Sequence, residues 1–309
     1  MIKKRKYIVA TRSSLLAYTQ TQQTVELLKK KNPECDFEIV KISTHGDKVT
    51  DIPLTTFGGT GVFVKELENA IIQGKAHFAV HSLKDVPSIQ PDELVLASFP
   101  PREDPRDILL IKNNLSINEL PDNCIIGTGS PRRMVQIAHI KPNVVFNDLR
   151  GNIDTRLQKL KDGHYDAIVL AAAGLNRLGK QIDANAFLSV DSCIPSVGQG
   201  AIAIECRKDD NETIEMLRTI NDNNTEISIV AERSYMKTIG GGCKFPLGAY
   251  ARVENELVQL SVMIGNHHTN QLIRMSDYSS LAKAEELGKM LAEKIILEAE
   301  KQGIEIIYN

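Results

Sequence analysis

The stretch CIIGTGSPRRMVQIAHI, residues 124–140, predicts a strand, a turn of small residues and then a helix. Ser130 is placed to cap that helix, and Pro131 suits its first position, where no intrahelical N–H bond is lost. The same order returns over residues 143–163, NVVFNDLRGNIDTRLQKLKDG. Repeated strand–turn–helix units favour an α/β domain with largely parallel strands.

The N-terminal third follows the same rule. YIVAT (residues 7–11), the segment 37–44 and HFAVHS (residues 77–82) are typical of strands, and a helix is predicted over Ser14–Lys31. After VGQGAIAIECR (residues 197–207) two helices are predicted, Asn211–Ile220 and Thr225–Ile239, and then a group of strands and one long helix, so the pattern changes near residue 222. This change indicates a separate α+β domain.

Bulk composition excludes several classes of protein. The chain has 309 residues, 42% of them hydrophobic and 25% charged, which is ordinary for a globular protein of more than one domain. No apolar run approaches the roughly 20 residues of a membrane span, and no secretory signal is recognisable. The five cysteines have no zinc-type spacing, so we expect reduced thiols, no metal and a cytoplasmic protein.

Arginine is concentrated in the middle of the chain. The net charge is only −2, and aromatic residues make up 5%, which disfavours a nucleic-acid binder. Arginine binds carboxylate and phosphate groups through two parallel hydrogen bonds. The concentration therefore indicates an anionic ligand, with a solvated basic face as the alternative. Of 14 arginines, seven fall in this region: Arg102, Arg106, Arg132, Arg133, Arg150, Arg156 and Arg177.

Two predicted turns carry these arginines. Arg132 and Arg133 lie in the first turn of a helix, where the helix dipole disfavours cations, so local stability does not account for them. A bound anion would, since helix N-termini at the carboxyl ends of strands receive anions. In DLRGNIDTR (residues 148–156), Arg150 and Arg156 flank a second turn of this kind. Together the two turns could hold a ligand with several carboxylates.

IGGGCKFPLGAY, residues 239–250, surrounds Cys243 with glycine. This thiol could be a nucleophile, a ligand, an attachment point or a cysteine in a turn. It has no histidine within twenty residues, and it follows a predicted helix C-terminus, which does not lower a thiol pKa. The pattern therefore favours an attachment point over an activated nucleophile.

HSLKDVP, residues 81–87, ends a predicted strand with Lys84 beside Asp85. An aspartate near a cationic substrate could stabilise positive charge or transfer protons. The alternative is a solvated turn.

These motifs occur together in one known family. The chain resembles porphobilinogen deaminase, also called hydroxymethylbilane synthase, over nearly its whole length. The matching runs include IVATRSSLLA, GVFVKELENAI, HSLKDVP, REDPRD, LRGNIDTRL, DAIVLAAAGLNRLG, PSVGQGAIAIECR and AERSYMKTIGGGCKFPLGAYA.

The resemblance implies an α/β fold with two domains of the type II periplasmic-binding-protein kind and a smaller C-terminal α+β domain. Domain 1 would comprise residues 1–100 plus 200–219, domain 2 residues 101–199, and domain 3 residues 222–309. The implied activity is stepwise deamination and head-to-tail joining of four porphobilinogen molecules onto a covalent dipyrromethane cofactor. Hydrolysis then releases hydroxymethylbilane for tetrapyrrole (heme) biosynthesis.

The resemblance also implies roles for residues. Cys243 would hold the dipyrromethane by a thioether, and Asp85 would be the catalytic carboxylate. Arg12, Ser14 and Arg177 would contact porphobilinogen. The remaining cofactor-binding residues would be Lys84, Ser130, Arg132, Arg133, Arg150 and Arg156.

Some positions depart from the family pattern, and other readings remain. Thr56 and Thr60 stand where relatives carry basic residues, and we expect the loop from about Lys48 to Gly59 to be a lid. A non-catalytic anion-binding module would need neither the aspartate nor the thiol. We expect a monomer without nucleic-acid or membrane partners.

Overall fold

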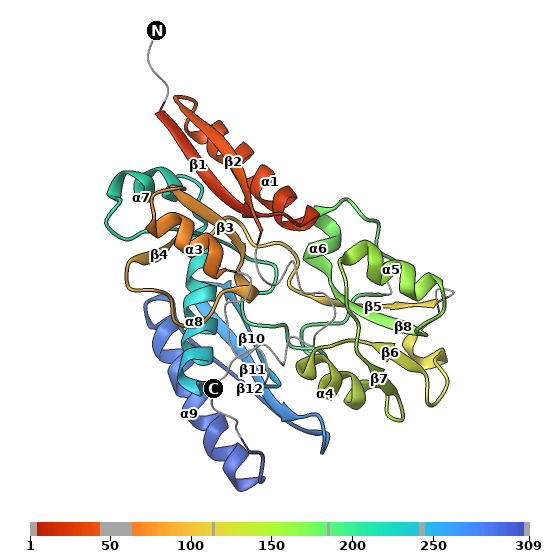
Figure 1. Cartoon of the computed structure of the whole chain (residues 1–309). Helices are drawn as coiled ribbons and strands as arrows, with labels where there is room; N and C mark the ends of the chain where they lie inside the picture. The colour runs from red at the N-terminus through yellow and green to blue at the C-terminus, as the bar shows by residue number, and fades with distance from the viewer. Residues whose placement is uncertain (1–4, 44–63, 113–114, 184–185, 241–244, 306–309) are drawn as a thin grey trace. The chain divides into compact units, whose positions relative to one another are not determined.

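The computed structural model describes residues 5–43, 64–112, 115–183, 186–240 and 245–305. The chain separates into two compact units. The first comprises Met1–Glu103 with Ala201–Glu226, and the second Asp104–Gly200 with Ile227–Asn309. The chain thus leaves the first unit and returns to it once (Figure 1).

A five-stranded sheet forms the first unit, in the order β2-β1-β3-β9-β4. β1 pairs in parallel with β2 and β3, whereas β9 runs antiparallel between β3 and β4. Apolar side chains of α1 and α7 pack against this sheet, which contributes Tyr7, Phe37 and Phe78 to the shared core. Its elements are β1 (Arg5–Arg12), α1 (Leu15–Lys31), β2 (Cys35–Ile42), α3 (Lys65–Ile72), β3 (Phe78–Ser82), the 3-10 turn η1 (Leu83–Asp85), β4 (Leu94–Ser98), β9 (Ile202–Arg207) and α7 (Asn211–Arg218).

A four-stranded sheet in the order β5-β8-β6-β7 belongs to the second unit. β6 pairs in parallel with β7 and β8, and β5 runs antiparallel to β8. Its elements are β5 (Asp107–Ile111), η3 (Ile117–Glu119), β6 (Ile125–Gly127), α4 (Pro131–Ile140), β7 (Val145–Asn147), α5 (Ile153–Lys161), β8 (Ala167–Ala171) and α6 (Ala172–Arg177).

The same unit contains a three-stranded antiparallel sheet, β10-β11-β12. Two long helices, α8 and α9, pack on it and share its core (Figure 1). Where α9 meets α8, a Cβ on Gly288 would lie 2.3 Å from the carbonyl oxygen of Ala231. The elements are α8 (Asn223–Ile239), β10 (Leu247–Glu254), β11 (Leu257–Asn266), β12 (Gln271–Ser280), η5 (Leu281–Lys283) and α9 (Ala284–Lys301).

The predicted class, α/β with a separate C-terminal sheet and helices, is confirmed by these elements. Most strands of the two α/β sheets run parallel, as predicted, and each sheet contains one antiparallel strand, β9 in the first and β5 in the second. The segment after β8 forms the short helix α6. The division into three domains stays a prediction, and the expected lid lies outside the described residues.

Candidate functional site

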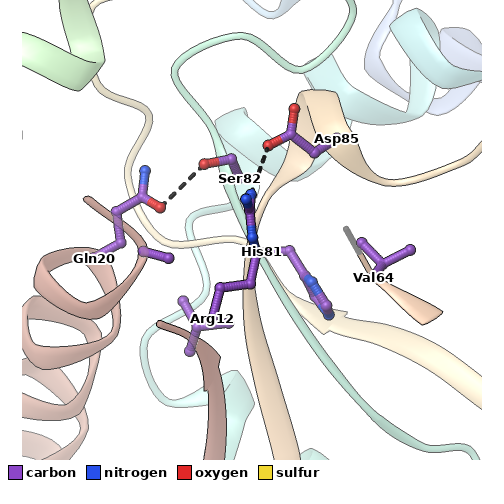
Figure 2. A pocket seen from close by; sticks show the side chains of 8 residues that line it. Arg12, Gln20, Val64, His81, Ser82 and Asp85 are labelled. Atoms are coloured by element: carbon purple, nitrogen blue, oxygen red, sulfur yellow. Dashed lines mark hydrogen bonds and ion pairs between the residues drawn. The ribbon is translucent and has the colours of Figure 1, made fainter. Parts of the chain in front are cut away.

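Asp85 ends the single turn η1, which follows directly from β3. Its Oδ2 lies 4.0 Å from Nη1 of Arg12, which ends β1. The two strands are parallel neighbours, so their carboxyl ends bring the two side chains to one edge of the sheet. Figure 2 shows Arg12 extended toward Asp85. The side chain of Asp85 is 36% exposed, so it is available to a molecule from solvent.

A small polar pocket opens at this edge, with a volume of about 20 Å³. That volume holds about one water molecule. Within it, Oγ of Ser82 donates a 3.0 Å hydrogen bond to Oε1 of Gln20 on α1 (Figure 2). The pocket is lined by Arg12, Ala17, Gln20, Val64, Val80, His81, Ser82 and Asp85.

One pocket residue, His81, belongs to a buried cluster of three titratable side chains. Its Nε2 lies 3.0 Å from Oε2 of Glu205 on β9, and both side chains are almost fully buried. Glu68 of α3 is the third member, and burial, followed by the charge of Glu205, raises its pKa. Sequence reasoning did not find the partners of His81, because they lie on other elements and Glu205 is 124 positions away.

Lys84, expected at the cofactor, and the two other residues expected at the substrate, Ser14 and Arg177, have neighbours on their own elements or on a loop. Lys84 precedes Asp85 in η1 and is half-buried. Oγ of Ser14 caps α1 by accepting the N–H of Ala17 at 3.3 Å. In the second unit, Nη2 of Arg177 donates to the carbonyl of Gly200 at 2.7 Å.

The two arginine-bearing turns are adjacent in the structure. Gly127 of β6 is paired with Asn147 of β7, so the turns that follow them leave the sheet side by side. A Cβ on Gly129 would lie 2.4 Å from Oδ1 of Asp148, which only glycine permits without movement. Oδ2 of the same carboxylate accepts a 2.7 Å hydrogen bond from Nε of Arg150. The prediction that the two turns form one constellation is therefore consistent with their packing.

Arg156 lies on the first turn of α5. Its Nε donates to the carbonyl of Gly151 at 2.7 Å, and Asn152 caps the helix by accepting the N–H of Thr155. At the other turn, Ser130 is the N-cap position of α4 with Pro131 at the first helical position, as predicted. The Ser130 side chain makes no capping hydrogen bond.

Arg132 and Arg133 are buried around one carboxylate. Oδ2 of Asp107 lies 2.7 Å from Nη2 of Arg132, and Oδ1 accepts from Nη2 of Arg133 at 2.7 Å. Burial alone would raise the pKa of Asp107, but the two guanidinium charges outweigh it and hold that pKa well below its usual range. Arg132 also donates to the carbonyl of Ile194 at 2.7 Å, and Arg133 to that of Val169 at 3.1 Å.

This cluster carries an unbalanced charge. Two guanidinium groups face one carboxylate, and the nearby Cys193 thiol is neutral because burial raises its pKa to about 12. The net charge of these four side chains is therefore +1. An uncompensated charge away from water is costly, and an added carboxylate would compensate it. The arrangement fits a cofactor or substrate with carboxylate groups.

Cys243 lies outside the described residues, four positions beyond Ile239, where α8 ends. The four described cysteines, Cys35, Cys124, Cys193 and Cys206, are free and buried. Burial raises the pKa of Cys206 to about 12, as it does for Cys193, so neither is an activated thiol.

Among the described residues, His, Cys, Asp and Glu side chains form no group able to hold a metal ion. None of the described helices combines the length and the apolar character needed to cross a bilayer.

Parallel strands alternating with helices in both sheets place the chain in the α/β class, and arginines at the strand ends suit anionic ligands. Comparison with known families is more specific. Residues 7–215 match the model described as "Porphobilinogen deaminase, dipyromethane cofactor binding domain", and residues 226–297 match "Porphobilinogen deaminase, C-terminal domain". The chain belongs to the porphobilinogen deaminase family.

Individual relatives agree. A porphobilinogen deaminase of Brevibacillus brevis is 47% identical over 87% of this chain and 87% of its own length. One from a Geobacillus species is 42% identical over 98% of this chain and 97% of its own length.

Solved structures match less closely. A YaeC-family lipoprotein of Enterococcus faecalis matches with 14% identity and a TM-score of 0.43, over 69% of this chain and 89% of its own. A methionine-binding protein, MetQ, matches with 12% identity and a TM-score of 0.45, over 70% of this chain and 88% of its own. The fold class rests on the element order and sheet topology described above.

Family membership confirms the predicted activity and cofactor class. The chain is a transferase of tetrapyrrole biosynthesis that uses a dipyrromethane cofactor and takes porphobilinogen as substrate. The roles of individual residues are a separate question.

Proposed function

We propose that Asp85 is the catalytic carboxylate of this porphobilinogen deaminase and that Cys243 holds the dipyrromethane by a thioether. The observation that carries the first assignment is the place of Asp85 at a strand end, partly exposed beside a polar pocket and 4.0 Å from Arg12. The second assignment rests on the family's cofactor-binding domain and on the burial of the other four cysteines.

Each addition breaks the bond between the aminomethyl carbon of porphobilinogen and its nitrogen, and joins that carbon to a pyrrole carbon, which loses a proton. One ammonium ion leaves for each substrate joined. When bound, the dipyrromethane supplies the pyrrole carbon that accepts the first substrate. Asp85 stabilises the positive charge that develops on the substrate as the amine departs and moves protons at pyrrole nitrogen. Hydrolysis of the completed chain releases hydroxymethylbilane.

The cations hold carboxylates. Arg132 and Arg133 supply the net positive charge described above, and Arg150 and Arg156 lie at the adjacent turn with part of their surface exposed. Lys84 and Ser130 complete this set, while Arg12, Ser14 and Arg177 contact the substrate. Every pyrrole ring of porphobilinogen carries two carboxylates, so a growing chain of such rings needs several cations.

We further propose a monomeric, cytoplasmic enzyme without nucleic-acid or membrane partners. The net charge of −2 and the low aromatic content support the absence of nucleic-acid and membrane partners. We also propose three domains, residues 1–100 with 200–219, residues 101–199 and residues 222–309. Proteolytic fragments or separately expressed segments that fold with these boundaries would test the division.

Intact-mass measurement separates the enzyme from a non-catalytic anion-binding module. We expect the purified protein, or the apo-protein incubated with porphobilinogen, to carry the added mass of two pyrrole units. Cys243→Ser should lack that mass, whereas Cys35→Ser, at a buried thiol outside the site, should retain it. A protein that stays at its bare polypeptide mass after incubation would contradict the proposal.

A further inference from the structure

Glu232 of α8 holds two other segments of the second unit together. The side chain is fully buried. Its Oε2 accepts the backbone N–H of Gly198 at 2.7 Å, and its Oε1 accepts the backbone N–H of Ala251 on β10 at 2.8 Å. A carboxylate is suited to this position, because each of its two oxygens accepts one N–H.

Gly198 belongs to the loop Ser196–Gly200, whose backbone is held in an unusual conformation. Gly198 has φ +70° and Gly200 has φ +86°, values that favour glycine. Between them Gln199 is buried, and its Nε2 donates to the carbonyl of Pro105 at 2.8 Å and to Oδ1 of Asp107 at 3.0 Å. The loop therefore connects Glu232 to the aspartate at the centre of the arginine cluster.

Asp107 sets the position of both arginines. Oδ1 is shared between Gln199 and Arg133, and Oδ2 lies against Arg132. A rotation of this carboxylate would move both guanidinium groups, since a densely packed interior allows no independent adjustment. Hydrogen bonds and the covalent chain thus connect Glu232 through Gly198, Gln199 and Asp107 to the arginines without a break.

We propose that Glu232 is a positioning residue for Arg132 and Arg133, acting through the loop Ser196–Gly200. The inference rests on the proposed function in one respect, that these arginines hold carboxylates of the cofactor and the growing chain. Glu232 lies on α8, the helix that ends four residues before Cys243. One helix would thus lead into the attachment segment and also orient the cations that receive the attached group.

The test compares Glu232→Gln with Tyr235→Phe. Glutamine offers one acceptor oxygen in place of two, so either Gly198 or Ala251 loses its partner. Tyr235 lies one turn further along α8 and is fully buried, and its hydroxyl donates at 3.1 Å to the carbonyl of Met263 on β11, not to the loop Ser196–Gly200. Both variants lose one buried hydrogen bond, but only the first disturbs the path to the arginines.

Cofactor uptake is followed by intact mass after apo-protein is mixed with porphobilinogen, and kcat and KM are measured on the loaded enzyme. We expect Glu232→Gln to slow uptake and lower kcat by about 10- to 100-fold, because misplaced binding groups cost rate in this range. KM for porphobilinogen should change less, since the pair holds the attached chain rather than the incoming substrate. Tyr235→Phe should match the unaltered protein in uptake and kcat.

Gln199→Leu supplies a second, independent variant if Glu232→Gln does not fold. It removes the side-chain donations of Gln199 to Pro105 and Asp107 and leaves Glu232 its hydrogen bonds to Gly198 and Ala251. We expect the same loss of cofactor uptake. The double variant should be no more impaired in uptake than the more impaired of the two single variants. Normal uptake by Gln199→Leu or Glu232→Gln would overturn the inference. Failure of the unaltered protein to take up cofactor would instead overturn the proposed function, so the two failures are distinguishable.

Discussion

Nη2 of Arg132 lies 2.7 Å from Oδ2 of Asp107, an aspartate with no exposed surface. Replacing Asp107 by asparagine removes the only negative charge among the described side chains of this cluster and leaves two buried guanidinium groups facing each other. We expect Asp107→Asn to lower the free energy of unfolding by about 3–5 kcal/mol, the cost typical of breaking a buried ion pair. Denaturant unfolding of both proteins at pH 7 measures this difference in the free energy of unfolding.

The same pair makes stability depend on pH. The folded-state pKa of Asp107 lies below its ordinary value of 3.8, so the unfolded chain binds this proton more readily than the folded one. The stabilisation is fully present above about pH 4 and is lost as pH falls through the depressed folded-state pKa. The difference in stability between the unaltered protein and Asp107→Asn should therefore shrink on acidification. A constant difference down to pH 2 would contradict this assignment.

Asp85→Asn should remove turnover without disturbing the fold. Its side chain is 36% exposed and 4.0 Å from Arg12, and an ion pair of this kind contributes at most about 1 kcal/mol to stability. Loss of the catalytic carboxylate should lower kcat by about 10²- to 10⁴-fold. The rate of hydroxymethylbilane formation measures the change, with exposed Asp92→Asn as the control. Near-normal turnover by Asp85→Asn would refute its role.

Arg150→Ala and Arg156→Ala should each impair cofactor uptake or chain elongation. A hydrogen bond to a charged group contributes about 1.5–3 kcal/mol, which corresponds to roughly 10- to 100-fold in rate or affinity. Mass spectra of enzyme mixed with limiting porphobilinogen would show accumulation of short chains. Arg218→Ala, at an exposed arginine on α7, should behave as the unaltered protein. Equal elongation by all variants would show that neither arginine holds a carboxylate.

Gly129→Ala should affect binding more than stability. The new Cβ would lie 2.4 Å from Oδ1 of Asp148, a side-chain atom that can move away. We expect a loss of about 1 kcal/mol or less in unfolding free energy, together with slower cofactor uptake because the Asp148–Arg150 contact is displaced. Thermal denaturation and intact mass on one sample distinguish these effects. A large stability loss with normal uptake would contradict the prediction.

Gly288→Ala should act on stability alone. The added Cβ would lie 2.3 Å from the carbonyl oxygen of Ala231, a backbone atom that cannot turn aside. Overpacking of this kind costs about 1–3 kcal/mol, which thermal or denaturant unfolding would detect. Lys289→Ala, at the next and exposed position, should change stability by less than about 0.5 kcal/mol.

Local features of the candidate site could be predicted from neighbouring residues. Ser130 and Pro131 begin α4, as the turn chemistry indicated, and Asn152, a typical capping residue, caps α5. These signals act within a few residues, so they survive without any knowledge of the fold. The concentration of arginine in the middle of the chain was equally visible.

The partners of those arginines could not be predicted in the same way. Asp107 lies 25 positions before Arg132 in the sequence, and REDPRD contains three acidic residues with no local sign of which one is buried. The contact between Gly198 and Glu232 likewise spans 34 positions. Such pairs depend on which strands are neighbours, and strand order is a property of the whole sheet.

The sequence by itself determined the elements, the family and the residue types that serve an anionic substrate, because periodicity, capping and motif content are local. Only the tertiary structure decided how the charges combine. It buried Asp107 between two arginines, placed antiparallel β9 and its Glu205 beside His81, and joined Glu232 to Gln199 through one loop. Charge balance and hydrogen bonding depend on distances in space, and the fold sets those distances.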